Sequence, residues 1–213
     1  LPDICREKAS VVPLGVNPAE FYPSENASIE LTILYAGNLI QAKGVAYLVR
    51  ALAKIVETVP ETRLRIAGDG PEKRNLQMLT ESLRIEDNVE FLGAVPFPQM
   101  PGLFRQSSIF CLPTLAEAFG LGLLQAMASG IPVIASRVGG IPYFVEDGKS
   151  GYLVPSCDVD ALVEKLLFLL QDPGKRAEMG AFNRQLVQSK YNWTHIVDRL
   201  EDIYKSVLEN VPG

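Results

Sequence analysis

The sequence has 213 residues, of which 47% are hydrophobic and 21% are charged, and its formal net charge is −5 at pH 7. These values are typical of a soluble globular protein with one good-sized domain or two small ones. Lys and Arg are spread among Asp and Glu, so no segment indicates a nucleic-acid or anionic-membrane surface, and no apolar run is long enough to cross a bilayer.

The first 28 residues are interpreted as a connector. The sequence begins at Leu1 without a methionine, and the stretch "ASVVPLGVNPAEFYP" (9–23) is rich in Pro and turn residues. We expect residues 1–28 to be an exposed connector that leads into the domain, and the chain to be a piece of a longer protein.

From residue 29 to residue 213, apolar strand-like runs alternate with helical runs. The candidate strands are "LTILYAG" (31–37), "RLRIAG" (63–68), "VEFLGAV" (89–95), "SIFCLP" (108–113), "IPVIAS" (131–136) and "GYLVP" (151–155). Helices are predicted over 45–59, from its apolar spacing, and over 72–84. Strands separated by helices imply parallel neighbours joined by right-handed crossovers, so the sequence predicts a doubly wound, Rossmann-like α/β fold.

After Asp158 the pattern is helical throughout. Helices are predicted over 158–172, 175–189 and 192–210, which together form a C-terminal helical tail.

The three cysteines, Cys5, Cys111 and Cys157, lie far apart in the chain. Their odd number and wide spacing argue against a disulfide framework and against a metal cluster. We therefore expect a reducing, cytoplasmic setting and no bound metal.

Ligands of a doubly wound sheet bind beyond the carboxyl ends of its strands, where helix N-termini offer free N–H groups to anions. The stretch "EAFGLGLLQAMASG" (117–130) brings Glu117 and a glycine turn to this position. The free N–H groups of residues 120–123 suit a phosphate or a diphosphate, and Gln125 lies in the next helical turn. The alternative interpretation is that Glu117 is a solvated loop acid and Gln125 a surface residue on a core helix.

A second loop, "GNLIQAKG" (37–44), places Lys43 at the mouth of the following helix, where a lysine can neutralise a phosphate. An ordinary surface lysine beside a helix start fits the same residues. The sequence contains neither a G-x-G-x-x-G motif after its first strand nor a phosphate-binding P-loop motif. The sole histidine, His195, lies beside Trp193 on the last predicted helix, where a role in packing or solvation is expected.

Six stretches together resemble a known family. They are "LYAGNLIQAKGVAYLVRAL", "LRIAGDGP", "VEFLGAV", "EAFGLGLLQAMASGIPVIAS", "VGGIPYFVEDGKSGYLVP" and "YNWTHIVDRLEDIYKSVL". In this order, and over nearly the whole chain, they resemble the C-terminal, nucleotide-sugar-binding half of retaining glycosyltransferases with the GT-B architecture, family 4, also called glycosyl transferases group 1.

The resemblance implies transfer of a sugar from a nucleotide diphosphate sugar to an acceptor hydroxyl with retention of configuration. It implies neither a cofactor nor a metal, because basic side chains and a helix N-terminus take the charge of the leaving diphosphate. By position, Lys43 and the backbone N–H groups of Gly120 and Leu121 would bind the diphosphate, and Val95 would lie beside the base. Glu117 is the first acid of the family's E-x7-E signature and would lie near the donor sugar.

Three positions depart from the family pattern. Gln125 replaces the second signature acid, which normally holds the ribose hydroxyls; Asn38 stands where a diphosphate-binding arginine is usual; and Tyr143 stands where an acid is usual. Two hypotheses follow. The chain is the donor-binding domain of an active retaining glycosyltransferase, or it is a degenerate, non-catalytic member that acts as a binding or scaffold module.

The resemblance also implies partners. The acceptor, a glycan or a lipid, would bind an N-terminal half that this chain does not contain, so we expect the chain alone to be inactive in transfer. A role in polysaccharide or glycolipid biosynthesis, with the full-length protein in the cytoplasm and peripherally associated with the inner membrane face, is the matching expectation.

Overall fold

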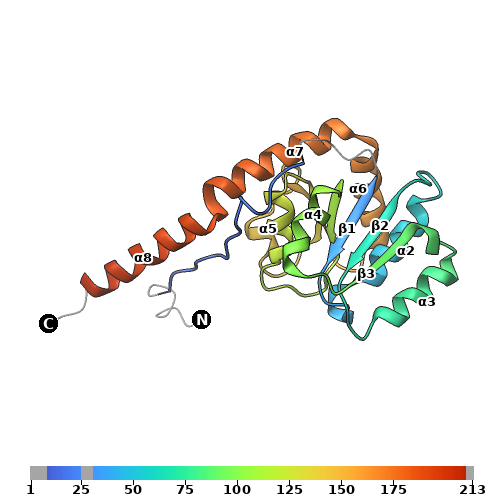
Figure 1. Ribbon diagram of the computed structural model, residues 1–213, viewed down its shortest axis with the longest axis horizontal. Coiled ribbons are helices and arrows are strands. Elements are labelled where there is room, and N and C mark those ends of the chain that lie inside the picture. Colours follow the sequence, from blue (N-terminus) through green and yellow to red (C-terminus); the bar gives the residue numbers. More distant parts are fainter. Residues whose placement is uncertain (1–8, 25–30, 210–213) are drawn as a thin grey trace.

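The computed structural model describes residues 9–24 and 31–209, and within these ranges a parallel sheet of six strands forms the centre of the molecule (Figure 1). In chain order the strands are β1 (Thr32–Ala36), β2 (Arg63–Ala67), β3 (Val89–Gly93), β4 (Ile109–Leu112), β5 (Val133–Ser136) and β6 (Gly151–Val154). Their spatial order is β3-β2-β1-β4-β5-β6, and every neighbouring pair is parallel. The doubly wound α/β fold predicted from the sequence is confirmed.

Helices connect the strands and cover both faces of the sheet, and further helices follow the last strand. They are α2 (Val45–Ile55), α3 (Lys73–Leu83), α4 (Met100–Arg105), α5 (Leu121–Ala128), α6 (Val159–Gln171), α7 (Pro173–Leu186) and α8 (Trp193–Glu209). Shorter turns are η1 (Gln41–Lys43), η2 (Glu86–Asn88), η3 (Phe97–Gln99) and η4 (Ile141–Tyr143), and the π-helical η5 (Val187–Tyr191) joins α7 to α8. Helix α2 packs against α3 and α6, whereas α5 packs against α4 and α7. Right-handed crossovers that run in opposite directions from the centre of the sheet place these two groups on opposite faces.

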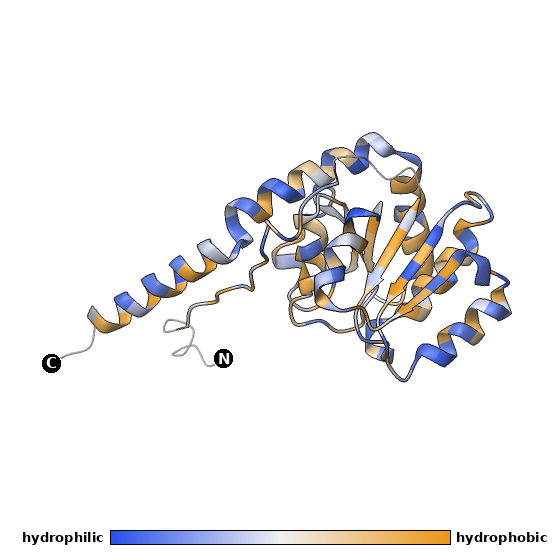
Figure 2. Cartoon of the chain, viewed as in Figure 1, coloured by the Kyte–Doolittle hydropathy of each residue, from blue (hydrophilic) through white to orange (hydrophobic). Residues whose placement is uncertain are grey.

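The central strands are apolar because helices cover both of their faces (Figure 2). Every residue of β4 and of β5 is buried. Burial of a large apolar side chain contributes about 1.5–3 kcal/mol, so these short strands are held mainly by the helices on either side. The rigid sheet in turn fixes the positions of the loops that follow each strand.

Helix α2 is shorter than predicted. It ends at Ile55, and the N–H groups of Thr58 and Val59 both donate to the Ile55 carbonyl, at 3.0 and 2.8 Å, in a tight turn. Pro60 disfavours helical backbone at Val59, the last residue of the predicted helix, and the helix itself ends four residues earlier. The apolar Val59, which the periodicity assigned to the helix, is buried from the turn instead.

The predicted helical tail is confirmed, with shifted boundaries. Helix α7 starts at Pro173, two residues earlier than predicted, because the Asp172 side chain accepts the Lys175 N–H at 2.8 Å and caps the helix. It ends at Leu186, where the chain continues as the π-helix. The predicted end of the last helix, at residue 210, lies outside the described ranges.

The connector was expected to be exposed, and this is wrong at Gly15, Val16 and Phe21. Phe21 is almost completely buried, at 1% exposure, and Val16 is buried as well. The Val16 N–H donates to the Tyr191 carbonyl at 2.9 Å, and Arg184 donates to the Phe21 carbonyl at 2.7 Å. A single apolar residue in a Pro-rich stretch has no periodicity, so the sequence pattern gave no sign that this segment docks on the domain.

Two sequence-based expectations fall partly or wholly outside the described ranges. The domain boundary expected at residue 28 lies among residues 25–30, so it stays a prediction. Cys5 also lies outside these ranges, whereas Cys111 is a buried free thiol and Cys157 an exposed one. No described helix is both long and apolar enough to cross a membrane.

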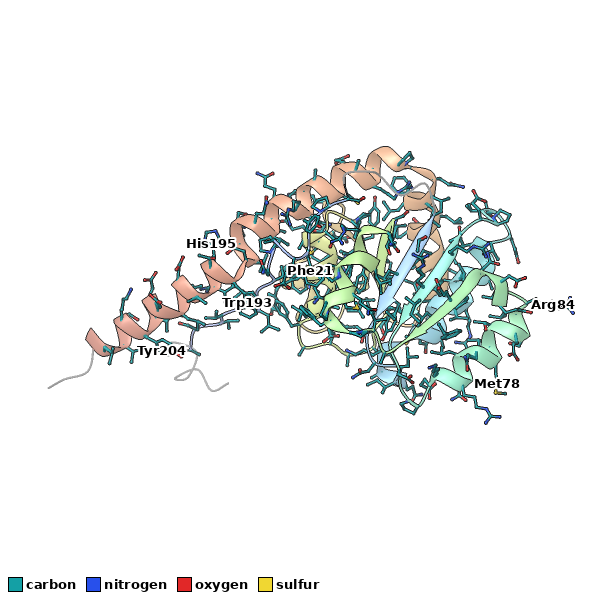
Figure 3. The ribbon with its side chains drawn as sticks, viewed as in Figure 1. Phe21, Met78, Arg84, Trp193, His195 and Tyr204 are labelled. Carbon is teal, nitrogen blue, oxygen red and sulfur yellow. The ribbon has the colours of Figure 1, made fainter. Side chains whose placement is uncertain are left out.

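Helix α8 extends away from the sheet domain as a long arm, with the connector residues beside it (Figure 1). Trp193, Val197 and Tyr204 on this arm are exposed, at 46%, 47% and 66%. His195 and Trp193 lie near its start, on the arm and not at the loops that follow the strands (Figure 3). The structure thus places the sole histidine far from the predicted ligand position.

Candidate functional site

The candidate site lies where the strand order reverses, between β1 and β4. These neighbouring strands lead into loops that turn in opposite directions, and the crevice between such loops is where doubly wound sheets bind ligands. The loop after β1 contains Asn38 and Lys43, and the loop after β4 contains Glu117. Both loops carry residues that the sequence singled out.

Lys43 and Glu117 form an ion pair across this crevice. The Lys43 Nζ lies 2.6 Å from the Glu117 Oε2, and the two side chains are 22% and 14% exposed. A pair so largely withdrawn from water is screened less by salt than a surface pair. The alternative that Glu117 is a freely solvated loop acid, or Lys43 an isolated surface lysine, does not describe this geometry.

Backbone bonds set the spacing of this pair. The Leu115 N–H donates to the Ala42 carbonyl at 2.8 Å, and the Thr114 hydroxyl contacts the same carbonyl at 2.9 Å. The loop after β4 is therefore bonded directly to η1, one residue before Lys43. The acid and the lysine meet because their two loops are held together by main-chain contacts.

The loop after β5 supports Glu117 from the other side. The Gly140 N–H donates to the Glu117 carbonyl at 3.3 Å. Gly139 has a left-handed backbone, with φ of 53°, and a Cβ at this position would overlap the Glu117 carbonyl oxygen. Only glycine permits this close approach, so the "VGG" stretch acts as a support for the acid.

Helix α5 directs its N-terminus toward the same crevice. It starts at Leu121, after Gly120 in left-handed conformation with φ of 89°, and no side chain caps it. Within the described ranges, no hydrogen bond to the N–H of Leu121 or Gly122 is found. These two amides are available to an anion. The expectation of free N–H groups over residues 120–123 is wrong for Leu123, whose N–H donates to the Gly120 carbonyl at 2.9 Å.

A hollow of about 380 Å³ lies beside the ion pair. Its walls come from the loops after β1, β2 and β3 and from α5, and we call it the Gln125 hollow. It is lined by Ala36, Gly37, Asn38, Ala67, Gly68, Asp69, Ala94, Val95, Met100, Gly122 and Gln125. Three residues that the sequence singled out, Asn38, Val95 and Gln125, thus line one cavity.

Gln125 is buried, at 8% exposure, so the alternative that it is a surface residue is wrong. Among the described residues, no hydrogen bond to its side-chain amide is found. An amide that lines a hollow and has no protein partner can form hydrogen bonds to a ligand there. Asn38, in contrast, is exposed at the rim.

Two charged groups near the hollow neutralise one another. Asp69, which lines it, pairs with Lys73 at 3.0 Å. The hydrogen bond from Lys73 and the bond from the Gly70 N–H hold the pKa of Asp69 below its usual range. The sequence pattern did not single out Asp69, although its "GDGP" turn follows a strand.

Tyr143 is not part of this arrangement. It lies on η4 with 90% of its surface exposed and borders a separate apolar groove together with Phe119 and Phe144. No group of three or more His, Cys, Asp or Glu side chains arranged to hold a metal ion is found in the described part of the chain.

The chain matches the family described as glycosyl transferases group 1 over residues 19–186. It is 36% identical over 181 residues to the N-acetyl-alpha-D-glucosaminyl L-malate synthase of Bacillus anthracis, covering 85% of this chain and 47% of that protein. It is 31% identical over 209 residues to a GDP-mannose-dependent phosphatidylinositol monomannoside mannosyltransferase of Mycolicibacterium smegmatis, covering 90% of this chain and 55% of that protein. The chain spans about half the length of these curated relatives.

A solved structure of similar extent is the C-terminal domain of a glycosyl transferase group 1 protein, LpcC, from Francisella tularensis. It superposes with a TM-score of 0.78 at 26% identity and covers 84% of this chain and 100% of that one. The similar region is therefore a domain that has been crystallised apart from the rest of its protein.

Proposed function

This chain belongs to the glycosyl transferases group 1 family, and from that premise we propose that it is the donor-binding domain of a retaining glycosyltransferase. The proposed reaction transfers a sugar from a nucleotide diphosphate sugar to an acceptor hydroxyl. The observation that carries the proposal is the Lys43–Glu117 pair beside the Gln125 hollow, at the carboxyl edge of the sheet.

In this proposal the leaving diphosphate binds between Lys43 and the N-terminus of α5. The ammonium of Lys43 and the free N–H groups at Leu121 and Gly122 supply positive charge where the diphosphate gains negative charge as the sugar bond breaks. These groups are already in place before the ligand arrives, and such preorganisation lowers the barrier most. A metal ion is not required by this arrangement.

Glu117 would contact the hydroxyls of the donor sugar. Its carboxylate is held by Lys43 on one side and its main chain by Gly140 on the other, so it has little freedom to move. A carboxylate fixed in this way accepts hydrogen bonds from sugar hydroxyls and orients the anomeric carbon toward the acceptor.

The Gln125 hollow would hold the nucleoside. The amide of Gln125 would bond to the ribose hydroxyls, and the chain at Val95 would contact the base. An amide makes neutral hydrogen bonds where a carboxylate would make charge-assisted ones, a difference of about 1 kcal/mol. We therefore propose that ribose binding is weaker here than with the usual acid and is retained.

A thermal unfolding experiment tests the proposal. Nucleotide sugars with uridine, guanosine and adenosine diphosphate are added to the 213-residue chain, and at least one is expected to raise its melting temperature. Both Lys43→Ala and Glu117→Ala are expected to abolish that rise. If no donor stabilises the chain, the proposal is wrong.

A second function, a non-catalytic binding or scaffold module, is favoured by Asn38 and Gln125 departing together from the family pattern. The double variant Asn38→Arg with Gln125→Glu distinguishes the two. If it binds a nucleotide sugar that the parent chain does not bind, the module is the better account; if the parent binds, the enzyme is.

The remaining parts of the proposal concern the full-length protein. The acceptor, a glycan or a lipid, would bind a further N-terminal domain, and this chain alone would not transfer sugar. The cytoplasmic location, peripheral association with a membrane and a role in polysaccharide or glycolipid synthesis stay predictions.

A further inference from the structure

Tyr35 is a buried side chain that the proposed function leaves without a role. It lies on β1 with 0% exposure, and its hydroxyl donates to the carbonyl oxygen of Asn38 at 2.9 Å. A phenol hydroxyl buried in an apolar strand needs a hydrogen-bond partner, and here that partner is the loop that borders the Gln125 hollow.

The peptide between Asn38 and Leu39 is held from both sides. Its carbonyl accepts from the Tyr35 hydroxyl, and its N–H, that of Leu39, donates to the Asp69 carbonyl at 2.9 Å. One residue earlier, the Gly37 N–H donates to the Ala67 carbonyl at 2.9 Å. These three bonds fix the main chain on either side of Asn38.

The N–H of Asn38 itself is the group left over. Within residues 9–24 and 31–209, no hydrogen bond to this N–H or to the Asn38 side chain is found, while Asn38 lines the Gln125 hollow. An N–H held on a rigid loop at a ligand cavity is a preorganised donor. It stands at the position where the family resemblance implies a diphosphate-binding arginine.

The Tyr35 hydroxyl keeps its proton. Burial raises the pKa of Tyr35 above its usual value, and the negative charge of Glu117 raises it further. The phenol is therefore a permanent hydrogen-bond donor to the Asn38 carbonyl across the working pH range.

We propose that Tyr35 is a positioning residue. Its hydroxyl fixes the peptide between Asn38 and Leu39, and so holds the loop in the position in which the Asn38 N–H binds the diphosphate of the donor. The inference rests on the proposed function. In this chain the Asn38 N–H, on a loop held by the Tyr35 hydroxyl, takes over part of the role of the arginine side chain. Tyr35 acts only through that N–H.

The test compares Tyr35→Phe with the parent chain in calorimetric titrations. UDP, GDP and ADP are titrated first, and the tightest of them is then compared with its own nucleoside. Loss of the hydroxyl is expected to weaken nucleoside diphosphate binding about threefold to tenfold, while binding of the nucleoside changes less than about twofold, because only the diphosphate contacts the Asn38 N–H. A general loosening of the fold would weaken both ligands equally.

Two further variants sharpen the result. Tyr152→Phe removes a hydroxyl on β6. The Tyr152 ring packs on Phe168, with 5.9 Å between the ring centroids, and this variant is expected to leave both affinities unchanged. Replacement of Tyr35 by 4-aminophenylalanine keeps a donor at the same point of the ring and is expected to restore diphosphate binding, even if Tyr35→Phe does not fold.

Equal loss for nucleoside and diphosphate, no loss at all, or failure of 4-aminophenylalanine to restore binding would overturn the inference alone. A parent chain that binds none of the three diphosphates would overturn the proposed function and this inference with it.

Discussion

The Lys43–Glu117 pair and the Gln125 hollow lie side by side, and they differ in how their polar groups are satisfied. At the pair, two opposite charges lie 2.6 Å apart and their loops are bonded to each other. In the hollow, the polar groups that the sequence singled out are uncharged, and no hydrogen bond to the side-chain amides of Gln125 and Asn38 is found among the described residues. At the reacting end of the proposed site the charged side chains are paired without a ligand. At the nucleoside end the side-chain amides are left for a ligand to bind.

On the proposed function, this difference separates the reaction from the binding of the nucleoside. Charge at the leaving diphosphate and at the donor sugar acts on the transition state, so its loss lowers the rate. Contacts to the ribose hold substrate and transition state alike, so replacement of an acid by Gln125 changes affinity more than rate. The predictions below separate the two ends.

The largest effect is expected at the pair. Lys43→Ala removes a charged donor from the diphosphate, and such contacts contribute about 1.5–3 kcal/mol, so the affinity for nucleoside diphosphates should fall about tenfold to a hundredfold. Titration calorimetry measures the change. The matched control is Lys54→Ala, which removes a lysine from another 2.6 Å ion pair, with Asp160, on the exposed surface. If both variants changed the affinity alike, Lys43 would not bind the diphosphate as proposed.

The support beneath the acid should come next. Gly139→Ala places a Cβ against the Glu117 carbonyl and is expected to lower the free energy of unfolding by about 1–3 kcal/mol, with weaker binding of nucleotide sugars. Chemical denaturation measures the stability. Gly148→Ala is the control, because Gly148 also has a positive φ, of 81°, but open space around it. A similar loss in both variants would show that backbone strain, and not the contact with Glu117, is responsible.

Smaller changes of affinity are expected in the hollow, in opposite directions for two variants. Gln125→Glu offers charge-assisted hydrogen bonds to the ribose and should tighten nucleoside diphosphate binding about threefold to tenfold, whereas Gln125→Ala should weaken it by a similar factor. The comparison of both variants by titration separates charge from simple contact. Weaker binding by the Glu variant would mean that the ribose does not reach this residue.

The smallest effect is expected outside both ends. Tyr143→Ala removes an exposed ring that borders a different groove, so nucleoside diphosphate affinity should change less than about twofold. A large loss of affinity would mean that the donor site extends onto η4, and would contradict the two-part site proposed here.

Much of this arrangement followed from the sequence, because strands, helices and the loops between them obey local rules. Apolar runs ending in Gly or Pro predicted the parallel sheet, and the position of Glu117 and Lys43 after strands predicted that both reach the same edge. The effect of Pro60 on the residue before it is also a local rule. The prediction followed the apolar spacing instead and extended the helix to residue 59.

The features that the sequence did not show depend on contacts with backbone carbonyls and packed surfaces. The burial of Phe21, the support of Glu117 by Gly139 and the bond from Tyr35 to Asn38 each join a side chain or a glycine to a backbone carbonyl or a packed surface. Backbone carbonyls are the same in every residue, so no sequence pattern marks which one a hydroxyl will meet. Such contacts appear only in three dimensions.

The central claim is that this chain holds the diphosphate of a nucleotide sugar between Lys43 and the start of α5. Its most direct test is a calorimetric titration of UDP, GDP and ADP into the 213-residue chain in the presence of EDTA. The account predicts saturable one-to-one binding of at least one diphosphate, tighter than its monophosphate and weakened about tenfold to a hundredfold in Lys43→Ala. Absence of binding by all three, or equal binding by Lys43→Ala, would contradict it.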